Sequence, residues 1–137
     1  MAAFNKFNSF VEYLAEKVFD FQNDTFKVAF CAAANAPTSS NTVLANLTTA
    51  TTNADSVTLT VSSSSQTSGT YTLLFADKTI TATAGGIGPF RYVVIYDDTP
   101  TSPADPLVCW YDYGSEITVA LNETLTLDFT TSTFTIA

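Results

Sequence analysis

The sequence predicts a mostly β protein, a jelly-roll-like antiparallel β-sandwich with one short N-terminal helix. The composition is rich in threonine, valine, isoleucine and phenylalanine, which favour a pleated, half-buried surface. Eight or nine short strand-like runs follow one another at a spacing of roughly ten residues, which is typical of a sandwich or barrel. The length of 137 residues fits a single domain over residues 1–137. An immunoglobulin-like sandwich is the alternative topology.

Residues 4–19 predict the helix of this fold. Their apolar side chains recur at helical spacing and form one stripe, which consists of Phe7, Phe10, Val11, Leu14 and Val18. Ser9 and Glu12 have the spacing of a capping box, and Lys17 suits the last turn. The stripe must be covered, either by the domain's own sheet or, if the helix is a docking arm, by another subunit.

Several strands are expected before the centre of the chain. Residues 25–33 predict a first strand, and residues 36–55 form a polar surface excursion with at most one short strand. Residues 56–62 place Val57, Leu59 and Val61 on one face of a strand, and residues 63–69 form a loop. Residues 70–83 hold two strand-like halves around Asp77 and Lys78.

Two apolar runs, Phe90–Tyr96 and Leu107–Tyr113, form the central strand pair. Nearly every position in them is apolar, so we expect both faces of the pair to be covered. The connector contains three prolines and must leave the sheet. Residues 85–89 predict a turn before the first run, and Gly114 ends the second. Three short runs then follow at residues 117–121, 125–129 and 134–136, with turns at residues 122–123 and 131–132.

The residues that could carry chemistry are few. The chain has no histidine and no nucleophile, phosphate-loop or metal-binding motif. Four acidic residues concentrate near the centre, either as ordinary turn residues or as a calcium site: Asp97, Asp98, Asp105 and Asp112. We expect no metal or cofactor requirement and no enzymatic activity, because no pair of acids can be named for hydrolysis.

Charge and hydropathy argue against a nucleic-acid-binding protein and against a membrane-spanning protein. A net charge of −8 with scattered basic residues argues against nucleic acid as a partner. No apolar stretch is long enough to span a membrane, and no secretory signal precedes the domain, so we expect folding in a cytoplasm. Cys31 and Cys109 are then expected to stay reduced as small buried hydrophobes, with a disulfide as the alternative.

Aromatic residues gather in the central pair. We expect Trp110 and Tyr92 to lie mostly buried on adjacent strands, in the core or at a subunit contact; a carbohydrate platform is the alternative. A self-contact would favour a two-fold dimer, with a trimer as the second choice. The candidate interface residues from the pair and the helix are Phe7, Phe10, Leu14, Tyr92, Tyr96, Trp110, Tyr111 and Tyr113.

Three blocks, which together span most of the chain, resemble a family of small virion proteins of tailed bacteriophages, the capsid cement (decoration) proteins. They read FNKFNSFVEYLAEKVFDFQNDTFKVAF, SQTSGTYTLLFADKTITATAGGIGPFRYVVIYDD and PLVCWYDYGSEITVALNETLTLDF. Residues 36–62 depart most, since threonine, alanine and serine replace an expected glycine-rich stretch. The resemblance implies a jelly roll without catalytic residues, made in the host bacterial cytoplasm and bound to the major capsid protein on the outer capsid surface. A tail or fibre component with a glycan-binding role is the alternative.

Overall fold

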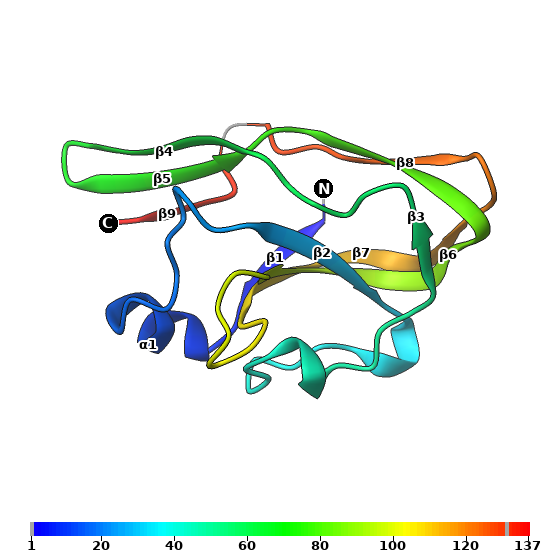
Figure 1. The fold of residues 1–137 in the computed structure, drawn as a ribbon, viewed down its shortest axis with the longest axis horizontal. Helices are drawn as coiled ribbons and strands as arrows, with labels where there is room; N and C mark the ends of the chain where they lie inside the picture. Colours follow the sequence, from blue (N-terminus) through cyan, green and yellow to red (C-terminus); the bar gives the residue numbers. More distant parts are fainter. Residues whose placement is uncertain (1, 131) are drawn as a thin grey trace.

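The computed structural model describes residues 2–130 and 132–137, and it confirms the prediction of a mostly β, antiparallel fold with one α-helix (Figure 1). Two short 3-10 turns, Ala33–Asn35 and Leu44–Asn46, lie in the excursion after β2. The elements are β1 (Ala3–Lys6), α1 (Ser9–Ala15), β2 (Phe26–Cys31), β3 (Thr52–Ala54), β4 (Val61–Thr67), β5 (Thr70–Phe75), β6 (Lys78–Asp97), β7 (Leu107–Val119), β8 (Thr124–Leu127) and β9 (Phe134–Ile136).

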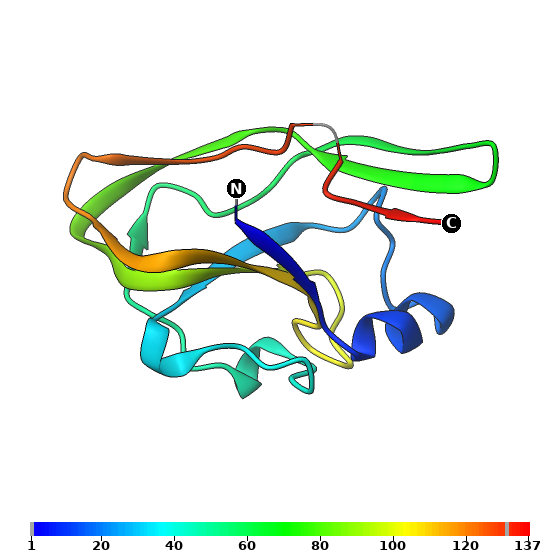
Figure 2. The same cartoon turned by 180° about the vertical axis from the view of Figure 1, so that it is seen from behind.

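The strands form two layers, and β6 belongs to both. The larger sheet has the order β1-β7-β6-β2, with β3 and β8 also paired to β6, and the smaller sheet has the order β4-β5-β9. In both ribbon views β6 starts beside β8 in the layer that holds β4 and β5, then bends into the layer that holds β2 and β7 (Figures 1 and 2). The result is a β-sandwich whose layers share one long, bent strand.

The main core lies between the layers. Alternate residues of β2, namely Phe26, Val28 and Phe30, face the smaller sheet, where Leu73 and Phe75 meet them. The intervening residues of β2 point to the outer face of the larger sheet, where a second buried cluster forms with Phe7 and the loop after β2. That cluster consists of Phe7, Ala29, Cys31, Val94, Tyr96 and Leu107. The prediction that both faces of the central pair are covered is therefore confirmed.

The predicted turn at residues 85–89 is wrong, because β6 runs through it without a break. Gly85, Gly86 and Gly88 all have positive φ, and the pairing of β6 with β7 shifts register between Ile87 and Phe90. These are bulges, which bend a strand and increase its twist while keeping it in the sheet. The glycines thus make the bend by which β6 changes layer. Gly114 likewise lies inside β7 and does not end it.

We expect Gly88→Ala to destabilise the protein much more than Gly114→Ala. Both glycines have a φ near +100°, so both substitutions carry a backbone strain of roughly 1–3 kcal/mol. A Cβ at Gly88 would also lie 2.8 Å from the backbone oxygen of Ile117, whereas a Cβ at Gly114 meets nothing within 4 Å. Urea unfolding of both variants measures the difference, and equal losses would contradict the role of Gly88 at the bend.

The predicted N-terminal helix is shorter than expected, since α1 covers only Ser9–Ala15. Residues Ala3–Lys6 instead form β1, because they pair along β7, whose edge would otherwise be open. The predicted capping box is absent: Asn8 is the N-cap and makes no side-chain cap bond. Lys17 lies beyond the helix with a φ of 62°. The predicted stripe is therefore split, with Phe7 on the outer face of the larger sheet and Phe10 in the main core.

The predicted strand at residues 56–62 and the loop at residues 63–69 are shifted. Strand β4 begins at Val61 and continues through the serines to Thr67, paired with β5. Cross-strand bonds compensate for the lack of apolar anchors, and the Ser64 hydroxyl lies 2.8 Å from that of Tyr71. The predictions for residues 25–33, 36–55 and 70–83 are confirmed by β2, β3 and the β5–β6 pair. Of the predicted turn at residues 131–132, Thr131 lies outside the described residues.

Candidate docking surface

An apolar groove opens on one side of the sandwich, between the two sheets. It has a volume of about 340 Å³, and its walls come from β1, α1, the start of β7 and β9. The side chains that shape it include Phe4, Phe10, Leu14, Val108, Phe134 and Ile136. Two apolar residues at its rim are well exposed, Phe4 at 44% and Val11 at 56% of their surface. Such a groove offers a binding partner apolar surface that the chain itself leaves open.

Edge strands flank this groove. Within the described residues β1 pairs only with β7, and β9 pairs only with β5. Each strand therefore has one side without a neighbouring strand. An edge strand carries backbone N–H and C=O groups that are free to pair with another chain.

Lys6 is the single charged side chain among the residues that line the groove. In the part of the chain that the structure describes, the ion pairs join Lys27 to Asp98 and Arg91 to Asp112, so Lys6 is unpaired. The groove therefore carries a positive side chain that has no ion-pair partner, on a protein whose net charge is −8. That charge favours a partner with an acidic group at this position.

The structure brings only two of the predicted interface residues, Phe10 and Leu14, to the groove. Phe7 is fully buried and packs on Trp110, with ring centroids 4.5 Å apart. Trp110 and Tyr92 lie on adjacent strands, as predicted, and they are partly buried against the outer cluster, where we expected them to be mostly buried. Phe4 was missed by the sequence reasoning, because a helix was expected where β1 forms.

The remaining tyrosines of the predicted cluster point in different directions. Tyr96 is buried in the outer cluster, whereas Tyr111 packs against the main core beneath Phe4. Burial raises the pKa of the Tyr111 hydroxyl far above its usual range. Tyr113 is 58% exposed. The aromatic residues thus do not gather into one exposed platform.

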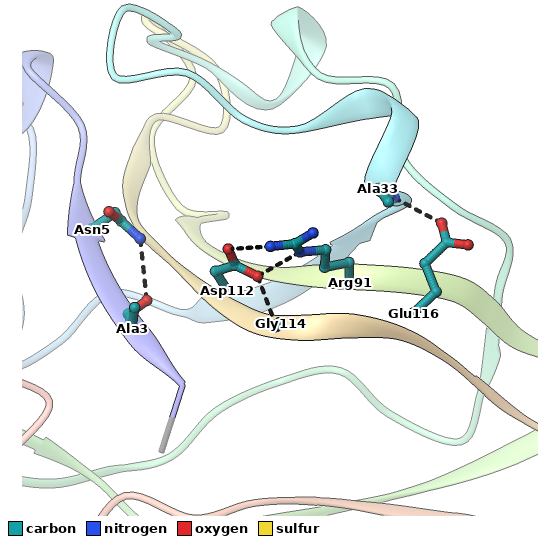
Figure 3. Close-up of polar contacts among 7 residues, drawn as sticks. All are labelled: Ala3, Asn5, Ala33, Arg91, Asp112, Gly114 and Glu116. Atoms are coloured by element: carbon teal, nitrogen blue, oxygen red, sulfur yellow. Dashed lines mark hydrogen bonds and ion pairs between the residues drawn. The ribbon is translucent and has the colours of Figure 1, made fainter.

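A polar group across β6 and β7 has a structural role (Figure 3). The guanidinium of Arg91 donates two hydrogen bonds to Asp112, Nε to Oδ1 at 2.7 Å and Nη2 to Oδ2 at 2.9 Å. Oδ1 of Asp112 also accepts the backbone N–H of Gly114 at 2.8 Å. The bond from Arg91 is the main reason that the pKa of Asp112 is lowered. Glu116 accepts the N–H of Ala33 at 2.8 Å and so fixes the start of the excursion.

Asp97 is the most unusual acidic residue. It is fully buried at the end of β6, where Oδ1 accepts the N–H of Thr99 at 3.0 Å and Oδ2 has no donor. The carboxyl group of Asp24 lies within hydrogen-bond reach of it. Burial, and then the bond with Asp24, raise the pKa of Asp97 to about 8. A protonated Asp97 can donate to Asp24 and so satisfy the oxygen that is otherwise unpartnered.

The four acidic residues that concentrate near the centre of the sequence do not share one site. The backbone oxygen of Asp105 accepts the N–H of Leu44. Asp98 pairs with Lys27 at 2.9 Å, Asp112 pairs with Arg91, and Asp97 faces Asp24. Among the described residues no three acidic, histidine or cysteine side chains converge in a way that could hold a metal ion.

Both cysteines are buried and free, as predicted, so the alternative of a disulfide is not realised. Cys31 on β2 and Cys109 on β7 pair with opposite sides of the intervening strand β6. Burial raises the pKa of the Cys31 thiol to about 11, and that of Cys109 higher still. Both thiols are thus protonated and unreactive at neutral pH.

Comparisons with family models, curated proteins and solved structures find no match to this chain. The likeness to phage capsid cement proteins thus rests on the sequence blocks described above. Among the described residues no helix is long and apolar enough to cross a membrane.

Proposed function

We propose that this chain is a non-enzymatic structural protein of a tailed-phage virion, a cement protein that binds the major capsid protein on the outer capsid surface. The resemblance of the three sequence blocks supports this role, and the jelly-roll topology that the resemblance implies is part of the proposal. The observation that carries the binding role is the apolar groove between β1 and β9, with Phe4 and Val11 exposed at its rim.

The physical logic of such a role is mass action. A protein that binds only the assembled shell stabilises the shell by an amount that grows with its concentration relative to the dissociation constant. A bound copy that contacts two neighbouring subunits links them, and many such weak links add up through avidity. The two layers share β6 and a common core, and a binding protein that is ordered before it binds loses less entropy on binding.

The alternative of a glycan-binding tail or fibre module has less support. Trp110 packs on Phe7, Tyr96 is buried and Tyr111 faces the main core, so an exposed sugar-stacking surface is not formed by these rings. Self-association, as a two-fold dimer or a trimer, needs a surface other than the central strand pair. Both faces of that pair are already covered within one chain.

We expect the purified protein to co-sediment saturably with phage shells that lack it, and to raise the temperature at which those shells disrupt. Mass spectrometry of purified virions should count hundreds of copies per particle, because a cement protein occupies repeated sites on the shell. A handful of copies would point to a tail tip or fibre, and wild-type protein that leaves both the pellet and the disruption temperature unchanged would reject the cement role. Light scattering of the free protein gives its oligomeric state.

A further inference from the structure

We propose that the groove receives an extended segment of the capsid subunit, which adds to β9 as a further strand and places an acidic side chain against Lys6. This inference rests on the proposed function and specifies how the contact is made. Three features support it, and all three lie at the groove: a free strand edge, an apolar surface and a lysine without an ion-pair partner.

The smaller sheet has an edge at which a strand can be added. It ends at β9, which pairs on one side with β5, through Tyr71 and Ile136 among others. The free side of β9 borders the groove, whose opposite wall is β1. On β1 the two side chains that face the groove, Phe4 and Lys6, are both exposed. A strand added beside β9 would therefore lie over these two side chains and cover them.

An extended segment fits this site better than a helix does. The free edge of β9 offers backbone hydrogen bonds, which only an extended chain can complete. Side chains of a strand alternate between its two faces, so every second residue of the added segment would point into the groove. The apolar walls formed by Phe10, Leu14 and Ile136 select apolar residues there. Lys6 selects an acidic residue at the end nearest to it.

Charge argues against a second copy of this chain as the occupant. Each copy carries a net charge of −8, so two copies repel each other before any contact forms. The single lysine in the groove does not offset that repulsion over a whole self-interface. A capsid segment with one well-placed acid meets the local positive charge and fits the groove.

The test measures binding of purified variants to shells that lack the protein. We expect Lys6→Glu and Phe4→Ala each to weaken binding by about tenfold or more, since both alter the contact surface. Lys17→Glu is the matched control for charge, because Lys17 is exposed beyond α1 and outside the groove. Leu121→Ala is the matched control for apolar surface, since Leu121 is 54% exposed in the turn before β8. Both controls should bind like the wild type.

Hydrogen exchange distinguishes strand addition from a contact made by side chains alone. On the shell, backbone amides of residues 134–136 should exchange more slowly than in the free protein. If the wild type binds the shells and Lys6→Glu and Phe4→Ala bind them with the same affinity, the groove proposal is overturned while the cement role stays intact. Unchanged exchange in residues 134–136 of bound protein would likewise overturn strand addition. Failure of the wild type to bind would reject the cement role and the capsid segment with it.

Discussion

Asp97→Asn will raise the stability of the protein, and the gain will increase as the pH rises from about 5 to about 8. In the folded protein the pKa of Asp97 is raised to about 8, above the ordinary value of 3.8. Between these values the folded state holds a proton that the unfolded state has lost. The contribution of Asp97 to stability is thus fully present at a pH below the pKa of the unfolded state. It is lost by about 1.4 kcal/mol per pH unit as the pH rises towards the pKa of the folded state.

Asparagine has nearly the shape of the protonated acid, stays neutral, and can donate to the carboxylate of Asp24. The other charged groups near Asp97 are Asp98, which opposes its ionisation, and Lys27, which is paired to Asp98. Thermal unfolding of wild type and variant across this pH range is the measurement. Asp128→Asn is the matched control, because it removes the same charge from an exposed side chain that is not among the groups that shift the pKa of Asp97. If the stability of the variant changed with pH as steeply as that of the wild type, the raised pKa of Asp97 would be contradicted.

Phe7→Ala should be among the most damaging substitutions, with a cost of about 3–5 kcal/mol in the free energy of unfolding. Phe7 is fully buried, although it belongs to the short link between β1 and α1. Its ring packs on Trp110 and fastens the N-terminal segment to the outer face of the larger sheet. Loss of that ring leaves a cavity and loosens β1 as well.

Trp110→Ala should cost somewhat less, because Trp110 is only partly buried. The double variant should fall short of the sum of the two losses by about 0.5–1.5 kcal/mol, the range for a contacting aromatic pair. Urea unfolding with Val11→Ala as the control measures these values, since Val11 is 56% exposed and should shift stability by less than about 0.5 kcal/mol. Strictly additive losses would mean that the two rings do not stabilise one another.

The sequence predicted those features that depend on local composition. The apolar runs Phe90–Tyr96 and Leu107–Tyr113 have a side chain to bury on each face, and the structure buries both faces. The mostly β fold could likewise be predicted locally, because β-branched and aromatic residues occur in short runs that favour strands. Phe10 and Leu14 were among the candidate residues because their helical spacing is local too, and both line the groove.

The features that were missed depend on partners far away in the chain. The serines of β4 contain no apolar anchor, and only their pairing with β5 makes them a strand. Residues Ala3–Lys6 continue a helical pattern, but the open edge of β7 outweighs that preference. Asp24 and Asp97 face each other because the turn before β2 meets the end of β6. Nothing in the spacing of these residues indicates it.

The pairing of β1 with β7 also determines when the groove can form. Residues 3–6 leave the ribosome before their partners at residues 109–112, which follow about a hundred residues later. Contacts between such distant parts of a chain form slowly, since a long loop must close first. The groove needs β1 on one wall and β9 on the other. A chain interrupted before residues 134–136 therefore has no complete groove, and only chains that contain both strands can offer it to a partner.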